Sequence, residues 1–390
     1  MRSTASITAI RGCEHGTAFL DGATGSLWYV TTSGEVFCIA TKGVTDIQFG
    51  DKHALVLFEN GTVSVFATAW PEGMPEELVA NYKHDGQFAL GDRLPTGGLT
   101  PTTLVDIVHI ACGASTSYAV TSTGDLYSVG DNTYAQLANG SRTYSASATR
   151  DLKVSGLFAL ARSGVSRVTP GQNHVFVTLT DGTIVSYGSN MNFERGFHKD
   201  GDPLVAVQAE VAPLPAGLIR TTKARSVLIE PSGAVWHTGR TWGLLDKPLP
   251  EHHFAHSTEW RKVEGLELQD ICLDVAGSAI ALSNSNEVLF CSTGSELKFG
   301  AWSSTRYHLE KSGLHAEQIA LTPYASFIRQ NGEWHAAYEF NPNTALTVRD
   351  TDASKSYALM AHPQDWLHVA TMRNIGLSGD SAIQAALALA

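Results

Sequence analysis

Charge is scarce in this sequence, and positive charge is scarcer than negative charge. Charged residues make up 17% of the 390 residues, and 27 Lys and Arg stand against 38 Asp and Glu, so that the formal net charge is −11. A protein that binds the phosphate backbone of nucleic acid needs a basic surface. The sequence contains no basic run, so we expect no direct binding to nucleic acid, and the acidic balance favours a partner with a basic surface.

Paired cysteines and long apolar runs are also missing. The five cysteines include no C-x-x-C pair, and several lie in strand-like apolar segments. This pattern favours free thiols and a reducing compartment. No apolar run approaches the roughly 20 residues of a membrane-spanning helix, and residues 1–12 lack the apolar core of a signal peptide. We expect a cytoplasmic or nuclear protein without a membrane span.

Signatures of catalysis are weak. The sequence contains no G-x-G-x-x-G motif and no P-loop. Residues 251–256 (EHHFAH) could in principle offer zinc ligands, but their spacing is unlike that of a zinc protease and no cysteine pair assists them. Gly379-Asp380-Ser381 resembles a serine-nucleophile loop, but no base is placed beside it. We therefore expect no enzyme, no metal site and no cofactor.

Glycine, in contrast, is abundant and recurs in a pattern. Short apolar segments flank a turn that contains glycine or asparagine, which suits a tight hairpin because a central residue must take a positive φ. The best-preserved copy spans residues 107–140. Seven such turns occur, at residues 32–34, 59–61, 121–124, 180–182, 232–233, 284–286 and 331–332.

A second glycine strengthens the repeat. In three units it precedes the turn glycine by eleven residues, as Gly50, Gly113 and Gly171. Apart from the first pair, successive turns lie about 45 to 65 residues apart, which is typical of four-stranded β-propeller blades. We predict an all-β fold, and seven turns suggest seven blades. A strand over residues 7–10 would complete the last blade, so that the terminal segments close the ring.

The predicted propeller spans residues 1–345, and a C-terminal closing segment with a short helix at residues 381–390 spans residues 346–390. Long loops on a compact β scaffold are usually functional or disordered. Three insertions interrupt the repeat, at residues 67–103, 141–160 and 240–264.

Two units resemble a repeat of the RCC1-like (regulator of chromosome condensation type) family. Residues 110–137 begin with apolar residues and a glycine, continue with a tyrosine and a further glycine, and then contain Asn132 and Gln136. Residues 171–190 are a second clear copy. Alanine replaces both glycines of the family's Gly-Gln-Leu-Gly signature. The resemblance covers roughly residues 7–341. It implies a seven-bladed β-propeller in which Asn132 and Gln136 brace a blade loop.

The resemblance implies three classes of function: nucleotide exchange on a small GTPase, protein binding within a larger assembly, and ultraviolet reception by clustered tryptophans. The eight tryptophans are scattered and the Gly-Trp-Arg-His-Thr motif is absent, so the receptor class is discarded. We expect a non-enzymatic scaffold, a monomeric propeller that binds a protein partner through its face loops. Exposed aromatic side chains anchor such interfaces. The candidate partner-binding residues are Asp51, His53, Trp70, Tyr82, Phe88, Arg225, Trp242 and Trp260.

The alternative is a guanine nucleotide exchange factor for a Ran-like small GTPase. In the family's founding member, the acid of a Gly-Asp-x-His loop meets the GTPase and an insertion follows. Here Gly50-Asp51-Lys52-His53 precedes the insertion at residues 67–103. The competing interpretation is that Asp51 caps a loop and His53 hydrogen-bonds between blades. Arg225 stands where the family has a second histidine, and its positive charge weakens the exchange interpretation.

Overall fold

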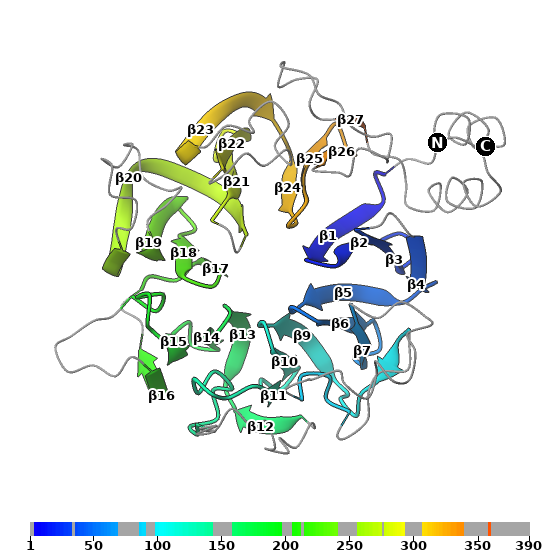
Figure 1. Cartoon of the computed structure of the whole chain (residues 1–390), viewed down its shortest axis with the longest axis vertical. Coiled ribbons are helices and arrows are strands. Elements are labelled where there is room, and N and C mark those ends of the chain that lie inside the picture. The colour runs from blue at the N-terminus through cyan, green and yellow to red at the C-terminus, as the bar shows by residue number, and fades with distance from the viewer. Residues whose placement is uncertain are drawn as a thin grey trace. The chain divides into compact units, whose positions relative to one another are not determined.

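Every regular element in the described part of the chain is a β-strand (Figure 1), as a computed structural model shows. The described residues fall into two compact units. We call residues 45–241 and 252–266 the central unit, and residues 1–44, 242–251 and 267–390 the terminal unit. The structure describes residues 4–32, 36–68, 86–90, 98–142, 158–196, 205–211, 214–240, 256–274, 277–292, 306–338 and 358–359.

Antiparallel groups of four strands make up the central unit, and each strand pairs with the next one along the chain. Its last group ends with the first part of the 18-residue strand β20. The strands are β5 (Val44–Phe49), β6 (His53–Phe58), β7 (Val63–Ala67), β8 (Thr100–Pro101), β9 (Ile107–Cys112), β10 (Thr116–Thr121), β11 (Leu126–Gly130), β12 (Ala159–Arg162), β13 (Val165–Pro170), β14 (His174–Leu179), β15 (Ile184–Ser189), β16 (Val205–Val211), β17 (Leu218–Thr221), β18 (Arg225–Ile229), β19 (Ala234–Arg240) and β20 (His256–Leu273).

The terminal unit repeats the same arrangement. The second part of β20 pairs with β21 and so begins a further group of four strands. The other strands are β1 (Ile7–Cys13), β2 (Gly16–Asp21), β3 (Ser26–Thr31), β4 (Val36–Ala40), β21 (Ala279–Ser283), β22 (Glu287–Ser292), β23 (Arg306–His315), β24 (Gln318–Leu321), β25 (Ala325–Gln330), β26 (Glu333–Tyr338) and β27 (Ala358–Leu359).

In the described residues, the strands form seven groups of four when β20 is counted in both of its groups, which is compatible with seven blades. Six of the seven predicted turns join the second strand of a group to the third. The first predicted turn is misplaced, because residues 32–34 connect β3 to β4. The equivalent turn is Gly22–Gly25, between β2 and β3, where Gly25 has a φ of 66°. The unusually short first spacing was the sign of this error.

The second strand of each group lies in the core. Leu55 and Val56 in β6, like Val227 and Leu228 in β18, are fully buried. Such a strand has a paired strand on both sides, and its two faces pack against neighbouring groups. This explains why these strands are almost continuously apolar in sequence rather than alternating.

The prediction that residues 7–10 complete the last blade is wrong. They belong to β1, which pairs with β2, for example at Ile10 and Phe19. The fourth strand of the last group is instead β27, from the predicted closing segment, and it pairs with β26 through His335 and Leu359. The helix predicted at residues 381–390 lies outside the described residues.

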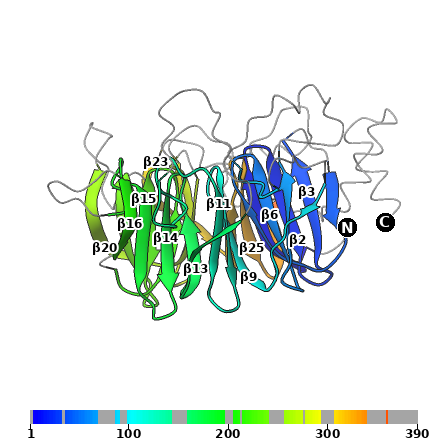
Figure 2. The same ribbon diagram turned by 90° about the horizontal axis from the view of Figure 1, so that it is seen from below.

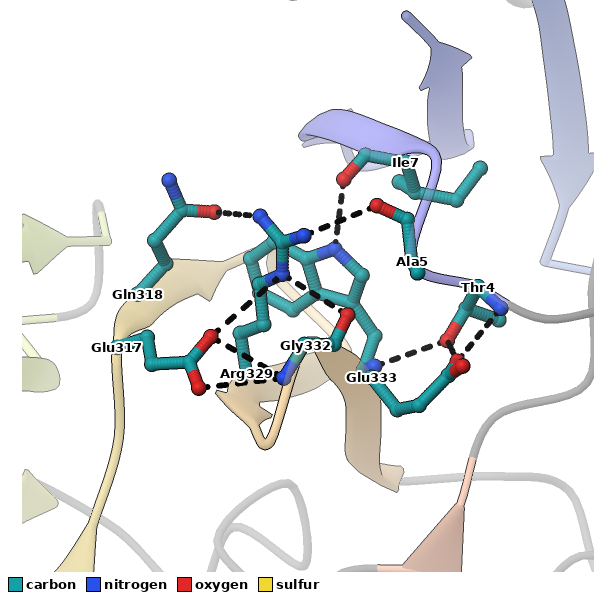
Figure 3. A network of polar contacts seen from close by, with 9 residues as sticks. Thr4, Ala5, Ile7, Glu317, Gln318, Arg329, Gly332 and Glu333 are labelled. Atoms are coloured by element: carbon teal, nitrogen blue, oxygen red, sulfur yellow. Dashed lines mark hydrogen bonds and ion pairs between the residues drawn. The ribbon is translucent and has the colours of Figure 1, made fainter. Parts of the chain in front are cut away.

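The N-terminal segment is nevertheless attached to the last group (Figure 3). Thr4 donates from its backbone N and its Oγ1 to Glu333 Oε2, at 2.6 and 2.7 Å, and Trp334 N donates to Thr4 Oγ1 at 2.9 Å. The Trp334 indole Nε1 donates to the carbonyl of Ile7 at 2.9 Å. We call residues 4–7 with the β25–β26 hairpin the N-terminal clasp.

Loss of the Glu333 carboxylate should weaken this clasp measurably. Thr4 is fully buried, so in Glu333→Ala its two donors lose their acceptor. We expect the free energy of unfolding to fall by about 2 kcal/mol, the usual scale for hydrogen bonds to a charged group. Glu333→Gln keeps one acceptor oxygen and should lose less. Urea unfolding measures both, and a Glu333→Ala midpoint equal to that of the parent protein would contradict the clasp.

Candidate partner-binding edge

The two ends of each strand group carry connections of very different length (Figure 2). In an antiparallel group, the first–second and third–fourth connections leave from one end, which we call the loop end. The second–third and fourth–first connections leave from the other, the turn end. The long connections all join third to fourth strands at the loop end: residues 68–99, 131–158, 190–204, 241–255, 293–305 and 339–357.

The three predicted insertions fall within these connections or overlap them. The third is shorter than predicted, because β20 begins at His256. Residues 190–204, 293–305 and 339–357 were not singled out in the sequence, although they occupy the equivalent position in their groups.

Side chains of the loop itself brace the connection after β11. Leu137 N donates to Asn132 Oδ1 at 3.1 Å, and Tyr134 N donates to Gln136 Oε1 at 2.8 Å. Gln136 Nε2 donates in turn to Asp131 Oδ2 at 2.8 Å. The bracing role predicted for Asn132 and Gln136 is confirmed.

The same loop recurs after β15 and also inside the first insertion. In residues 86–89 (GQFA), 135–138 (AQLA) and 193–196 (FERG), the first and fourth positions take positive φ. The φ values of the first and fourth positions are 84° and 57° in residues 86–89, 64° and 58° in residues 135–138, and 60° and 77° in residues 193–196. Ala135 and Ala138 thus adopt the left-handed conformation that favours glycine. The copy inside the insertion was missed, and its Gly-Gln-Phe-Ala sequence was the signal.

A buried histidine connects two neighbouring strand groups of the central unit. His53 Nε2 lies 2.9 Å from Ser117 Oγ, and that hydroxyl donates to the carbonyl of Gln87 at 2.7 Å. Because the serine proton is committed to the carbonyl, the histidine must donate from Nε2. Its Nδ1 is buried without a hydrogen-bond partner. The interpretation that His53 hydrogen-bonds between blades is confirmed.

His174 repeats this arrangement. Its Nε2 lies 3.3 Å from Ser226 Oγ, which donates to the carbonyl of Glu194 at 2.6 Å. Gln87 and Glu194 occupy the same position in their loops. The two relays therefore fix the bracing loops after β7 and β15 to the next group of strands.

Close approach to these rings explains two of the three glycines at fixed offset, while the third, Gly113, approaches Thr116 Oγ1 instead. A Cβ on Gly50 would lie 2.2 Å from His53 Cε1, and one on Gly171 would lie 2.1 Å from His174 Cε1. Neither distance is compatible with a side chain. The Gly-x-x-His pattern is therefore a packing requirement of the repeat.

Burial keeps these histidines neutral. Desolvation lowers the pKa of His53 and of His174 to about 4. His237, in β19, has its pKa lowered to about 4 by burial and by the nearby charges of Arg225 and Arg261. An uncharged, enclosed imidazole fits a structural role rather than contact with a partner.

The structure buries four of the eight candidate partner-binding residues. The exposed fractions are 0% for His53, 1% for Phe88, 2% for Arg225 and 8% for Trp260. The expectation that these side chains reach a partner from the surface is wrong for all four. Arg225 is the first residue of β18, so it presents no charge at the surface and no longer counts against the exchange interpretation.

Packing explains why the two aromatic residues are inside. Phe88 follows Gln87 in the bracing loop and joins the apolar core beside β6, β7 and β9, with an edge-on contact to His53. Trp260 lies in β20, packs against Phe176 and donates from Nε1 to the carbonyl of Arg195 at 3.0 Å.

Asp51 remains at the surface. It is exposed in the short loop between β5 and β6, at the loop end, and its backbone N donates to the carbonyl of Ala114 at 3.0 Å. The other three candidates, Trp70, Tyr82 and Trp242, lie outside the described residues.

Other kinds of site find little support in the described part of the chain. Its His, Cys, Asp and Glu side chains form no group of three that could hold a metal ion. All five cysteines are free thiols. Within the same residues, no helix is long and apolar enough to cross a membrane.

Antiparallel groups of four strands, joined by bracing loops, define a β-propeller fold. Residues 107–136 match the family described as the regulator of chromosome condensation (RCC1) repeat. The chain therefore carries a match to one RCC1 repeat and is similar to RCC1-like propellers.

Its relatives are diverse. The chain is 24% identical over 310 residues to the human E3 ubiquitin-protein ligase HERC2, a match that covers 68% of this chain and 6% of that protein. It thus spans only a small part of the curated relatives that it matches. Human WBSCR16 has a TM-score of 0.62 at 14% identity, over 82% of this chain and 85% of that one. Prp20p of Saccharomyces cerevisiae, whose structure is described with its binding to Gsp1p and histones, has a TM-score of 0.61 at 16% identity, over 78% and 76%. These structural likenesses show the fold.

Proposed function

We propose that this protein is a non-enzymatic scaffold that binds a protein partner at the loop end of its strand groups, within a larger assembly. The observation that carries the proposal is the placement of the long connections. Every connection longer than twelve residues between described strands leaves from the loop end, and none at the turn end exceeds six residues. Binding residues commonly collect on loops held by a rigid scaffold.

The bracing loops narrow the set of residues that we propose to contact the partner. Residues 86–90 anchor the first insertion in the core, so they divide it into residues 69–85 and 91–97. Two of the remaining candidates, Trp70 and Tyr82, fall in the longer piece, and Trp242 falls in residues 241–255. We assign partner contact to these two segments, together with Asp51.

Replacement of these segments tests the proposal. One variant carries a short Gly-Ser linker in place of residues 69–85, which leaves Phe88 and its anchor intact, and a second carries the same linker in place of residues 241–255. Affinity purification with mass spectrometry from the native source should show loss of the main partner in at least one variant, with unchanged thermal unfolding. Ser285→Ala, at an exposed position in the β21–β22 turn, is the control. Retention of every partner by a double replacement would show that the proposal is wrong.

Nucleotide exchange on a small GTPase is the second candidate. It is favoured by the exposure of Asp51 beside the first insertion and by the burial of Arg225. An exposed acid could compete for the P-loop lysine and so loosen the phosphate–Mg²⁺ contacts. A nucleotide-release assay with a panel of small GTPases tests whether the protein has this exchange activity. Exchange requires that one of them is accelerated and that Asp51→Asn reduces the effect at least about tenfold, a loss of about 1.4 kcal/mol.

We further propose that the protein acts as a monomer in the cytoplasm or the nucleus. The free cysteines support a reducing compartment. Light scattering of the purified protein and imaging of a tagged copy test the two statements separately.

A further inference from the structure

Between β6 and β15, the turn end of the central unit is a continuous, hydrogen-bonded rim. It consists of residues 59–62, 102–107, 122–125, 163–165 and 180–183, which we call the rim. Backbone hydrogen bonds fix each turn to the next and make the rim rigid. They run from Ile107 N to Gly61 O at 3.0 Å, and from Ser122 N to Asp106 O, Val165 N to Gly124 O and Thr180 N to Gly164 O at 2.9 Å each.

All charge in the rim has one sign. Its charged side chains are Glu59, Asp106, Asp125 and Asp181, and all four are acids. The backbone N of Thr183 donates to Asp181 Oδ1 at 2.8 Å, and this hydrogen bond lowers the pKa of that carboxyl group. The nearest base in sequence, Arg162, directs Nη1 to Tyr187 OH at 2.6 Å. The rim itself therefore carries only negative charge, and the charge of Arg162, which borders the rim, also helps to lower the pKa of Asp181.

Exposed apolar side chains gather at the same end. In the described part of the chain, four large apolar side chains are more than half exposed, and three of them belong to β9–β12 or to the connection that enters β9. Val105 in the rim is 60% exposed, Val108 at the start of β9 is 59% exposed, and Leu160, the second residue of the four-residue strand β12, is 57% exposed. Val105 and Val108 thus lie at one edge of this strand group and Leu160 at the other, with the acidic turn between β10 and β11 in between.

Spacing across the sheet suggests the form of the partner. β9 and β12 are the outermost strands of their group, so they lie three strand spacings apart, about 14 Å. Asp125 belongs to the turn between β10 and β11, which are the two middle strands. In an extended chain, residues i, i+2 and i+4 lie on one face, and i and i+4 are about 13 Å apart. An apolar-x-basic-x-apolar segment therefore matches the order of Val108, Asp125 and Leu160.

We propose that the rim is a second docking surface, which binds an extended protein segment with a lysine or arginine between two aliphatic side chains. Apolar contacts bordered by complementary charge are the usual composition of a specific interface. The negative charge disfavours nucleic acid and a second copy of the same rim. Because the rim lies at the end of the strands opposite to the loop end, this surface is independent of the proposed scaffold site.

Two peptides of identical composition test the proposal. One carries Leu-Ser-Lys-Ser-Leu between neutral flanks, and the other carries the same residues as Leu-Leu-Ser-Ser-Lys. Isothermal titration against the full chain should give at least about tenfold tighter binding for the first peptide, since only its spacing lets both leucines be buried. Its affinity should fall as salt is added, because salt screens the ion pair. Equal affinities would mean non-specific attraction to an acidic protein and would overturn the proposal.

Substitutions locate the surface. The double change Val105→Ser and Val108→Thr should lower the affinity about tenfold, as should Leu160→Ser. Asp106→Asn and Asp125→Asn should each lower it about threefold. The matched control is Met191→Ser, because Met191 is 51% exposed but lies in the loop after β15, at the loop end. Thermal unfolding of each variant confirms that it is folded. An effect of Met191→Ser as large as that of Leu160→Ser would place the peptide elsewhere and overturn the proposal.

Discussion

Phe88→Ala should lower the free energy of unfolding by about 3–5 kcal/mol, the usual cost of emptying a buried aromatic site. Phe88 is 1% exposed although it lies within the longest insertion, where the sequence is rich in proline, glycine and acidic residues. Its ring fills the core beside β6 and β9 and contacts His53 edge-on. Without the ring, Ala89 and the neighbouring Leu90 would be the buried apolar side chains left to hold the bracing loop at residues 86–89.

Chemical denaturation measures this effect, and Phe88→Leu serves as the graded comparison, with an expected loss of less than half as much. Met191→Ala, at an exposed position in a bracing loop, should change stability by no more than about 0.5 kcal/mol. Limited proteolysis gives an independent readout, because Phe88→Ala should expose the insertion to cleavage before the rest of the chain. A Phe88→Ala protein as stable as the Met191→Ala protein would contradict the buried anchor.

Acid should unfold the central unit through its buried histidines. The folded-state pKa of His53, His174 and His237 is about 4, whereas an unfolded histidine has a pKa near 6.5. Below pH 6.5 the unfolded chain therefore binds more protons than the folded one. Stability is complete above this pH and is lost as the pH falls towards 4. At pH 5 each histidine should cost about 2 kcal/mol relative to neutral pH.

Three such histidines together amount to about 6 kcal/mol, which is comparable to the whole stability of many domains. Urea unfolding at neutral pH and at pH 5 measures the loss. His53→Gln should reduce the pH dependence by about one third while it keeps a donor for Ser117, and Met191→Ala, which changes no titratable group, should leave it unchanged. An identical pH dependence in His53→Gln and the parent protein would contradict a neutral, buried imidazole at this site.

The sequence predicts those parts of the fold that depend on backbone conformation. Turn glycines and asparagines indicated six of the seven second–third turns correctly, because positive φ restricts the residue type at those positions. The inter-blade role of His53 was also accessible, since the Gly-x-x-His spacing reflects a close ring contact. The first turn was misplaced because two glycine-containing segments, at residues 22–25 and 32–34, compete within one group.

In contrast, the sequence alone did not indicate which side chains inside the insertions are buried. Phe88 and Trp260 resemble exposed anchors when each insertion is treated as a single polar loop. Phe88 instead belongs to a bracing loop, and Trp260 to a strand that begins earlier than predicted. Arg225 gives no sequence signal of burial, since arginine is among the residues that are least often fully buried. The rim was missed because its four acids come from four separate connections, and the exposed Val108 and Leu160 come from two different strands.

The N-terminal clasp also has a consequence for synthesis of the protein. Thr4 and Glu333 are 329 positions apart. At about 5–20 residues per second, a ribosome takes on the order of tens of seconds to make the intervening chain. During that time the first strands exist without the hairpin that holds residues 4–7. Early groups can fold locally, but Thr4 and the indole of Trp334 find their partners only when the chain is nearly finished. A nascent chain stalled before β26 should therefore leave its N-terminal residues accessible to chaperones and proteases.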